Sequence, residues 1–172
     1  MMYKFAVLFL FLSLSVFAAQ ADSSTSQCES LYQQHFKSDM ELSYQAFDQT
    51  PQQGFRALAA ECPQQAIELI KNYIILNNAQ EDSLRWHLAQ LLGEVGKTDE
   101  ATKYALSTLR DKPGTLLWNE YVEGYVAHWQ GDLEKLKTAI TVLESATEHK
   151  GNAINAKFLK QFADTLEQSQ QK

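Results

Sequence analysis

The chain has 172 residues, with 15 lysines and arginines against 21 aspartates and glutamates, and a formal net charge of −6. The charges of both signs are spread along the sequence and form no basic run, which argues against binding of nucleic acid or of anionic membranes. The length fits one domain that can bury about two-thirds of its surface.

The first 21 residues have the pattern of a secretory signal peptide. Lys4 precedes an apolar run from Phe5 to Ala19, and Ala19-Gln20-Ala21 offers the small residues of a cleavage site. The alternative is an uncleaved anchor, but the run is shorter than the roughly 20 residues that cross a bilayer. We expect cleavage after Ala21, with no stable membrane insertion afterwards. Residues 22–172 would then form one exported domain, periplasmic in a Gram-negative bacterium and otherwise secreted.

The only two cysteines, Cys28 and Cys62, lie beyond this cleavage site. In an oxidising compartment an isolated pair is most simply a disulfide. A bridge that closes a loop of this length would stabilise the fold by roughly 3–4 kcal/mol in the chain-entropy model. The alternative is a pair of buried free thiols.

The remaining sequence predicts an all-helical domain, because apolar residues recur at steps of three and four throughout. A first helix is expected from Glu29 to about Gln49, with a possible break near Ser38-Asp39. Thr50-Pro51-Gln52-Gln53 has the pattern of a capping box with proline at the first helical position, and predicts a short helix that ends at Glu61. Cys62-Pro63 then begins the next helix.

The following hairpin begins near Asp82 or Ser83. Its first helix is expected to end at Gly96, a residue suited to the left-handed conformation that ends helices. Thr98 or Asp99 begins its second helix, and Pro113-Gly114 ends the unit.

A third hairpin and a last helix complete the predicted elements. Thr115 can cap a helix from about Leu116 to Gln130 that stops at Gly131, and Asp132 caps the helix after it. Gly151-Asn152 breaks the pattern before a last helix, Ala153 to Gln168. This helix is expected to have a polar outer face and to bury Ile154, Phe158, Leu159, Phe162 and Leu166.

Three segments of the sequence superpose when it is shifted by 35 residues. In each segment a small residue is followed twelve positions later by an apolar one. A small residue leaves room for two helices to approach closely, so the pattern predicts stacked helical hairpins of about residues 47–81, 82–116 and 117–151. The pairs are Gly54 with Ala66, Ala89 with Ala101, and Gly124 with Leu136.

The middle unit resembles a tetratricopeptide repeat (TPR). Its matching positions are Leu88-Ala89, Leu92, Gly96, Ala101 and Pro113, with Trp86 close to the usual tryptophan site. The third unit keeps Gly124, Gly131 and Leu136 but lacks the terminal proline. The first unit keeps Gly54, Ala66 and Tyr73, with Cys62-Pro63 at the turn. The period of 35 is one more than that family's usual 34.

The resemblance covers about residues 47–151 and implies an all-α fold. This would be a right-handed stack of antiparallel helical hairpins, a TPR-like α-solenoid, with an extra N-terminal helix and a C-terminal capping helix at about residues 153–168. The first helix of each hairpin would form a concave wall, and such proteins usually bind peptides or proteins. A non-repeating helical bundle is the alternative.

Aromatic residues recur at helical spacing along one face of the predicted helices. In the TPR-like geometry this face is turned toward the concave groove. They could anchor a partner there, because large aromatic side chains bury much area at low rotamer cost. The alternative is that the stripe is simply core. The residues of this candidate stripe are Trp86, Gln90, Trp118, Tyr121, Tyr125 and His128.

No pattern in the sequence indicates catalysis. The four histidines lack the spacing of zinc ligands, and there is no nucleophile elbow or phosphate-binding glycine loop. We therefore expect no enzyme, cofactor or metal, but an exported scaffold that binds a protein or peptide. An inhibitor or immunity-type protein that blocks a single enzyme is the alternative, and the oligomeric state stays open.

Overall fold

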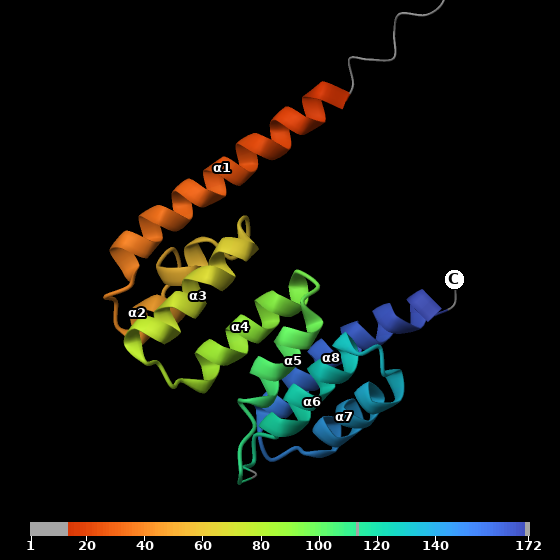
Figure 1. Ribbon diagram of the computed structural model, residues 1–172. Coiled ribbons are helices and arrows are strands. Elements are labelled where there is room, and N and C mark those ends of the chain that lie inside the picture. Colours follow the sequence, from red (N-terminus) through yellow and green to blue (C-terminus); the bar gives the residue numbers. More distant parts are fainter. Residues whose placement is uncertain (1–13, 113, 171–172) are drawn as a thin grey trace, which may run out of the picture. The chain divides into compact units, whose positions relative to one another are not determined.

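The computed structural model describes residues 14–112 and 114–170, with side chains from Thr25 onward. Every regular element in this part of the chain is helical, which confirms the predicted all-α class (Figure 1). None of the helices described is long and apolar enough to span a membrane. The chain divides into two compact units, Met1–Asn77 and Asn78–Lys172.

From residue 14 onward, the N-terminal unit contains three α-helices and one short 3-10 helix. These are α1 (Leu14–Asp39), α2 (Tyr44–Gln49), the 3-10 helix η1 (Gly54–Ala57) and α3 (Pro63–Asn77). The predicted signal peptide falls mainly on residues 1–13, which lie outside the described residues, and residues 14–21 form the first turns of α1. The predicted break near Ser38-Asp39 is confirmed, because α1 ends at Asp39.

The predicted helix from Pro51 to Glu61 is wrong. Only Gly54–Ala57 form a helical turn, because Gln52 and Gly54 have positive φ angles of 64° and 51° that interrupt the right-handed helix. A Cβ on Gly54 would lie 2.1 Å from the carbonyl oxygen of Phe47. Glycine is therefore required there for both its conformation and its close contact.

A disulfide between Cys28 and Cys62 joins α1 to the residue that precedes α3. This confirms the predicted bridge. In the same unit, the ring of Phe47 on α2 stacks on Tyr73 of α3 with 3.8 Å between centroids, and the Tyr73 hydroxyl donates to the carbonyl of Leu42 over 2.8 Å. The short helices are thus held on α3 by aromatic packing and a hydrogen bond.

Asp39 at the end of α1 holds this unit together through its carboxylate. It accepts hydrogen bonds from the Gly54 N–H at 2.8 Å, from Ser38 Oγ at 2.6 Å and from His35 Nδ1 at 2.8 Å. Burial by itself raises the pKa of Asp39, but the bonds from Ser38, His35 and Gly54 outweigh burial and lower it. The ionised form is therefore the one that the fold stabilises.

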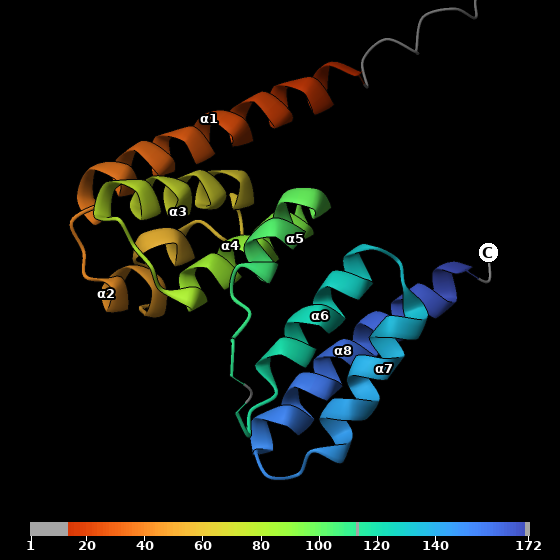
Figure 2. The ribbon, with the colours of Figure 1, turned by 60° about the horizontal axis from the view of Figure 1, so that its bottom comes forward.

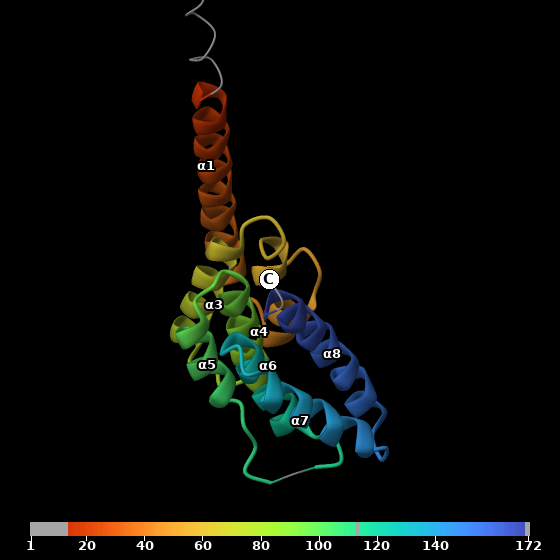
Figure 3. The same ribbon diagram turned by 90° about the vertical axis from the view of Figure 1, so that its right-hand side faces the viewer.

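In the C-terminal unit the described residues form five helices. These are α4 (Asp82–Glu94), α5 (Thr98–Leu106), α6 (Trp118–Trp129), α7 (Leu133–Ser145) and α8 (Lys150–Gln170). Helix α4 packs on α5, α6 on α7, and α7 on α8, and α6 also contacts α5 and α8 (Figure 2). Helix α8 runs alongside α7, as a second view shows (Figure 3).

The turns after α4 and α6 have the same backbone structure, 35 residues apart. Gly96 and Gly131 have φ angles of 78° and 69°, as predicted for glycines that end helices. In both turns the next N–H donates to the carbonyl five residues earlier, over 2.8 Å after α4 and 2.9 Å after α6, which is the bonding of a Schellman turn. Asp132 then caps α7 by accepting from the Lys135 N–H, as predicted.

At Gly124 the three helices α6, α7 and α8 lie close together. A Cβ at this position would lie 2.3 Å from a methyl group of Leu159 on α8 and 3.3 Å from the Cβ of Ala139 on α7. Gly93 on α4 has a similar role, since a Cβ there would lie 2.4 Å from the indole nitrogen of Trp129 on α6. Both glycines allow a large side chain to lie directly on a helix backbone.

Helix α8 begins at Lys150 rather than at Ala153, so Gly151-Asn152 does not break the pattern as predicted. Asn152 is buried and its amide joins three segments: Oδ1 accepts from Leu117 N–H at 2.9 Å, and Nδ2 donates to the carbonyls of Thr115 and Ala146. The first turn of α6 thus relies on Asn152, and Leu117 instead of the predicted Thr115 occupies its capping position.

The outer face of α8 is less polar than predicted. Leu159 is buried, and Phe162 and Leu166 pack against the core. Ile154 and Phe158, which were expected to be buried, are 54% and 48% exposed. They lie on the same stripe of α8, four residues apart.

The first prediction concerns Asp39. Because its folded pKa is below the unfolded value, its contribution to stability is present above about pH 4 and is lost as the pH falls through the folded pKa. Asp39→Asn should lower the urea midpoint at neutral pH. Below about pH 4, the midpoint of this variant should also fall less steeply than that of the wild type. Asp164→Asn, at an exposed site on α8, is the control. Parallel pH profiles for wild type and Asp39→Asn would contradict this role.

The second prediction concerns Gly124. Gly124→Ala should reduce the free energy of unfolding by about 1–3 kcal/mol, because the new methyl group collides with Leu159. Urea denaturation measures the change. In the control, Gly114→Ala, the added Cβ has no neighbour closer than 3.9 Å. Equal, small decreases in the free energy of unfolding for both variants would contradict this prediction, because they would show that Leu159 moves away from the new methyl group without loss of stability.

Candidate functional site

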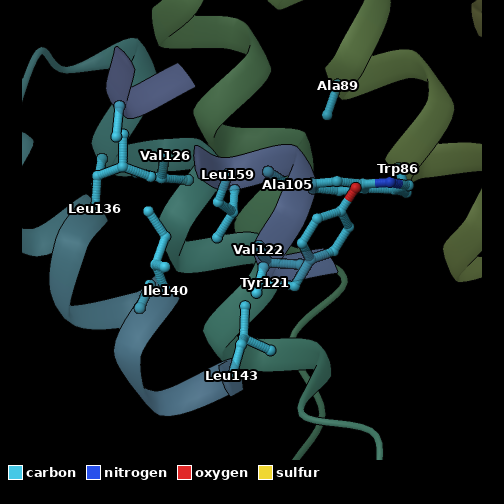
Figure 4. Packing of buried hydrophobic residues seen from close by; sticks show 14 residues of the cluster. Trp86, Ala89, Ala105, Tyr121, Val122, Val126, Leu136, Ile140, Leu143 and Leu159 are labelled. Carbon is cyan, nitrogen blue, oxygen red and sulfur yellow. The ribbon is translucent and has the colours of Figure 1, made fainter. Parts of the chain in front are cut away.

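The six residues of the predicted stripe are brought together in the C-terminal unit. Trp86 on α4 lies against three rings of α6, with centroid distances of 5.2 Å to Trp118, 5.5 Å to Tyr121 and 5.0 Å to Tyr125. Figure 4 shows Trp86 and Tyr121 side by side at the edge of the core. We call the rings of Trp86, Trp118, Tyr121, Tyr125, Trp129 and Phe162 the aromatic cluster.

The aromatic cluster is mainly a packing interface between α4, α6 and α8. Trp86 and Tyr121 are only 5% and 7% exposed, so they belong to the core. Tyr125 is half-buried, and its hydroxyl accepts from Gln90 Nε2 at 3.1 Å. Trp118 Nε1 donates to the carbonyl of Thr108 at 2.9 Å. The polar groups at the ends of these rings are therefore already bonded within the unit.

Phe162 of α8 completes the cluster, although the sequence stripe did not include it. Its ring lies 4.8 Å from Tyr125 and stacks on His128 at 4.2 Å. The helical spacing of α8 predicted that Phe162 is buried, but not which rings it meets, because α8 is distant in sequence from α4 and α6. The ring order α4, α6, α8 follows only from the tertiary structure.

His128 has an unusual environment within this interface. Its Nδ1 is buried without a hydrogen-bond partner, and burial lowers the pKa of the imidazole. The neutral ring is thus favoured, in keeping with its stacking on Phe162. Burial also raises the pKa of the neighbouring Tyr121, with a further contribution from Tyr125.

An open groove lies between α6 and α7, away from the aromatic cluster. We call it the α6–α7 groove; it has a volume of about 410 Å³. Its apolar lining comes from Val126 and Ala127 of α6 and Ala139 and Val142 of α7, of which only Val142 is exposed and the other three belong to the core. The other residues that line it are Glu120, Glu123, Gln130, Lys135 and Thr138.

The charges around the α6–α7 groove are unevenly distributed. Glu120 and Glu123 stand one turn apart on α6, and neither has an ion pair with a described residue. Lys135 on α7 is engaged by Asp132, 3.2 Å away. The α6 edge of the groove therefore carries two carboxylates without an ion pair among the described residues, and Glu120 also lines a small cavity with Arg110 and Lys112.

The sequence did not indicate this groove. Its lining residues follow helical spacing on α6 and α7, but small and polar residues at such spacing are typical of any solvated helix face. The available signal was the pair of alanines, Ala127 and Ala139, on helices predicted to be adjacent. Small side chains leave a depression between two adjacent helices. This depression stays open as a groove only if no third helix covers it.

Residues 14–112 and 114–170 contain no group of three or more histidine, cysteine, aspartate or glutamate side chains arranged to hold a metal ion. The four histidines stand on or beside different helices, α1, α4, α6 and the start of α8. Both cysteines are in the disulfide.

No protein-family model, curated protein or solved structure matches this chain. Its function is therefore inferred from its own residues. The two features with the clearest geometry are the aromatic cluster, which is largely satisfied internally, and the α6–α7 groove, which is open.

Tyr125 tests whether the cluster is core. Tyr125→Ala should lower the free energy of unfolding by about 2–4 kcal/mol, because it removes contacts with Trp86, Trp129 and Phe162 as well as the bond from Gln90. Thermal or urea denaturation measures it. Phe158→Ala, an exposed aromatic on α8, should change stability by less than about 0.5 kcal/mol. A Tyr125→Ala variant as stable as the control would place the ring outside the core.

Proposed function

We propose that this chain is an exported, non-enzymatic binding module in which TPR-like helical hairpins hold a segment of another protein or a peptide. The export signal in the sequence and the disulfide between Cys28 and Cys62 support the compartment, since disulfides persist in oxidising environments. The open surface of the C-terminal unit supports the binding role.

Recurring backbone contacts support the repeat on which this proposal rests. The bond from Ala101 N–H to the Lys97 carbonyl recurs 35 residues later at Leu136 and 35 residues earlier at Ala66, over 2.9, 3.1 and 3.0 Å. Residues at equivalent positions of consecutive units also bond to each other, as Gln90 does to Tyr125. A regular period in both sequence and bonding is typical of stacked helical repeats.

The α6–α7 groove is the observation that carries the binding role. A groove of about 410 Å³, with the exposed side chain of Val142 on one wall and charged residues at its rim, offers a concave surface to a partner. The aromatic cluster would act indirectly, by fixing α6 against α4 and α8. We accordingly assign the partner to the groove and a supporting role to the cluster.

Site-specific photo-crosslinking in the intact cell envelope tests this proposal. A photoreactive side chain at Thr138, which lines the groove, should capture a partner, whereas one at Gln161 on the exposed face of α8 should not. Equal capture at both positions, or at Gln161 alone, would contradict the assignment to the groove. Absence of any partner at Thr138 in cells that express the protein would contradict the binding role.

The affinity of the captured partner separates a scaffold from an inhibitor. Several partners with micromolar dissociation constants indicate a scaffold, and one enzyme held at nanomolar strength indicates an inhibitor or immunity-type protein. Titration calorimetry with the mature protein measures these constants.

A further inference from the structure

We propose that the exposed face of α8 binds a second copy of this chain, with the two α8 helices antiparallel and related by a two-fold axis. Three features of α8 support this partner: exposed apolar side chains, their heptad spacing, and two charges that complement each other only in an antiparallel pair. No residue of α8 lines the α6–α7 groove, so this proposal does not depend on the function assigned to the groove.

Two large apolar side chains are exposed on α8. Ile154 and Phe158 are 54% and 48% exposed, and they lie one turn apart on one face of the helix. The other large apolar residues of α8, Leu159, Phe162 and Leu166, pack into the unit, on the side where α8 meets α7 and α6. The exposed pair therefore faces away from the core, and covering it with a partner would remove apolar surface from water.

The exposed face of α8 has the spacing of a coiled-coil seam. Gln161 and Thr165 follow Ile154 and Phe158 on this face, at steps of four, three and four, and all four side chains are exposed. Alternating steps of three and four keep one face of a helix turned toward a partner helix along its length. We call these four residues the α8 seam. Its first half is apolar and its second half is polar.

The charges beside the α8 seam favour an antiparallel partner. Lys157 and Asp164 lie seven residues apart on one flank of the seam. Neither has an ion pair with a described residue, and Lys160, which lies one turn before Asp164, is engaged by Glu144 of α7. A two-fold axis midway between residues 160 and 161 places Lys157 opposite Asp164 of the partner subunit, and symmetry repeats the pair. In a parallel pair the two flanks lie on opposite sides of the contact, so these charges do not meet.

The register set by the charges also brings the apolar residues together. At 1.5 Å per residue, each Phe158 lies about 4 Å from the two-fold axis along the helix, and each Ile154 about 10 Å. The two copies therefore align their apolar residues in one row across the axis, with the two Phe158 side chains adjacent at its centre. With only two large apolar residues per copy, the contact should bury less than about 1,200 Å², the lower limit of stable interfaces. The dimer should accordingly be weak and reversible.

Sedimentation velocity of the mature protein over a range of about 5–500 μM tests this surface. The wild type should shift reversibly from monomer to dimer as its concentration rises. Phe158→Ala should weaken the dimer on the order of tenfold or more, because it removes the centre of the apolar row, while the unfolding of dilute protein stays unchanged. A wild type that is monomeric over the whole range would overturn the proposal, and so would a Phe158→Ala variant that dimerises as strongly as the wild type.

Reciprocal charge variants test the orientation of the two helices. Lys157→Glu and Asp164→Lys should each weaken the dimer on the order of tenfold, because each places like charges opposite one another. An equimolar mixture of the two variants should recover dimerisation, since opposite charges then meet on both halves of the contact. Lys103→Glu, at an exposed lysine on α5, controls for net charge. Failure of the mixture to recover, or equal weakening by Lys103→Glu, would overturn the antiparallel pair.

Two further measurements distinguish a second copy from other occupants of this face. A photoreactive side chain at Gln161, which lies beside the two-fold axis, should give a product of twice the chain's mass that contains only this chain. Its composition separates this product from another protein captured at Thr138, so either proposal can fail without the other. Another protein captured at Gln161 would overturn the dimer. Binding to phosphatidylglycerol vesicles that Phe158→Ala abolishes, without self-association in solution, would assign the face to a membrane surface and also overturn it.

Discussion

The C-terminal unit depends on the close approach of three helices at Gly124. Because no side chain separates α6 from Leu159 and Ala139, α8 can pack on both members of the preceding hairpin. The packing of α8 at this point determines which side of α7 is covered and hence which side is left for the α6–α7 groove. The constraint is steric: protein interiors are close-packed, so a single methyl group at this point must displace a helix or a side chain.

The aromatic cluster and Asn152 keep this arrangement in register. Rings from α4, α6 and α8 meet edge to face around Tyr125, a geometry that aromatic quadrupoles favour. At the other end of α6, the buried amide of Asn152 supplies partners for backbone groups that a helix end leaves open. Helix α6, which forms one wall of the candidate groove, is thus held in place at both ends.

The N-terminal unit has its own, different set of constraints. Its core is built on α3, and the long-range bridge from Cys28 to Cys62 restricts the unfolded chain over a separation of 34 residues. Asp39 supplies a partner for the Gly54 N–H at a turn where only glycine fits. In this unit a polar side chain and a covalent bond stabilise the connections between elements, whereas the hairpin turns have that role in the C-terminal unit.

The sequence by itself determined the helical class, the disulfide and the glycine turns, because these depend on periodicity and local conformation. Gly96, Gly131 and Asp132 act as predicted. The helix at Pro51 and the start of α8 were misjudged, since positive φ angles and the long-range bonds of Asn152 are not local signals. Only the tertiary structure decided that Trp86 and Tyr121 are core and that α6 and α7 leave an open groove beside Val142. Helical spacing places a residue on a face, but the neighbouring helices decide whether that face is covered.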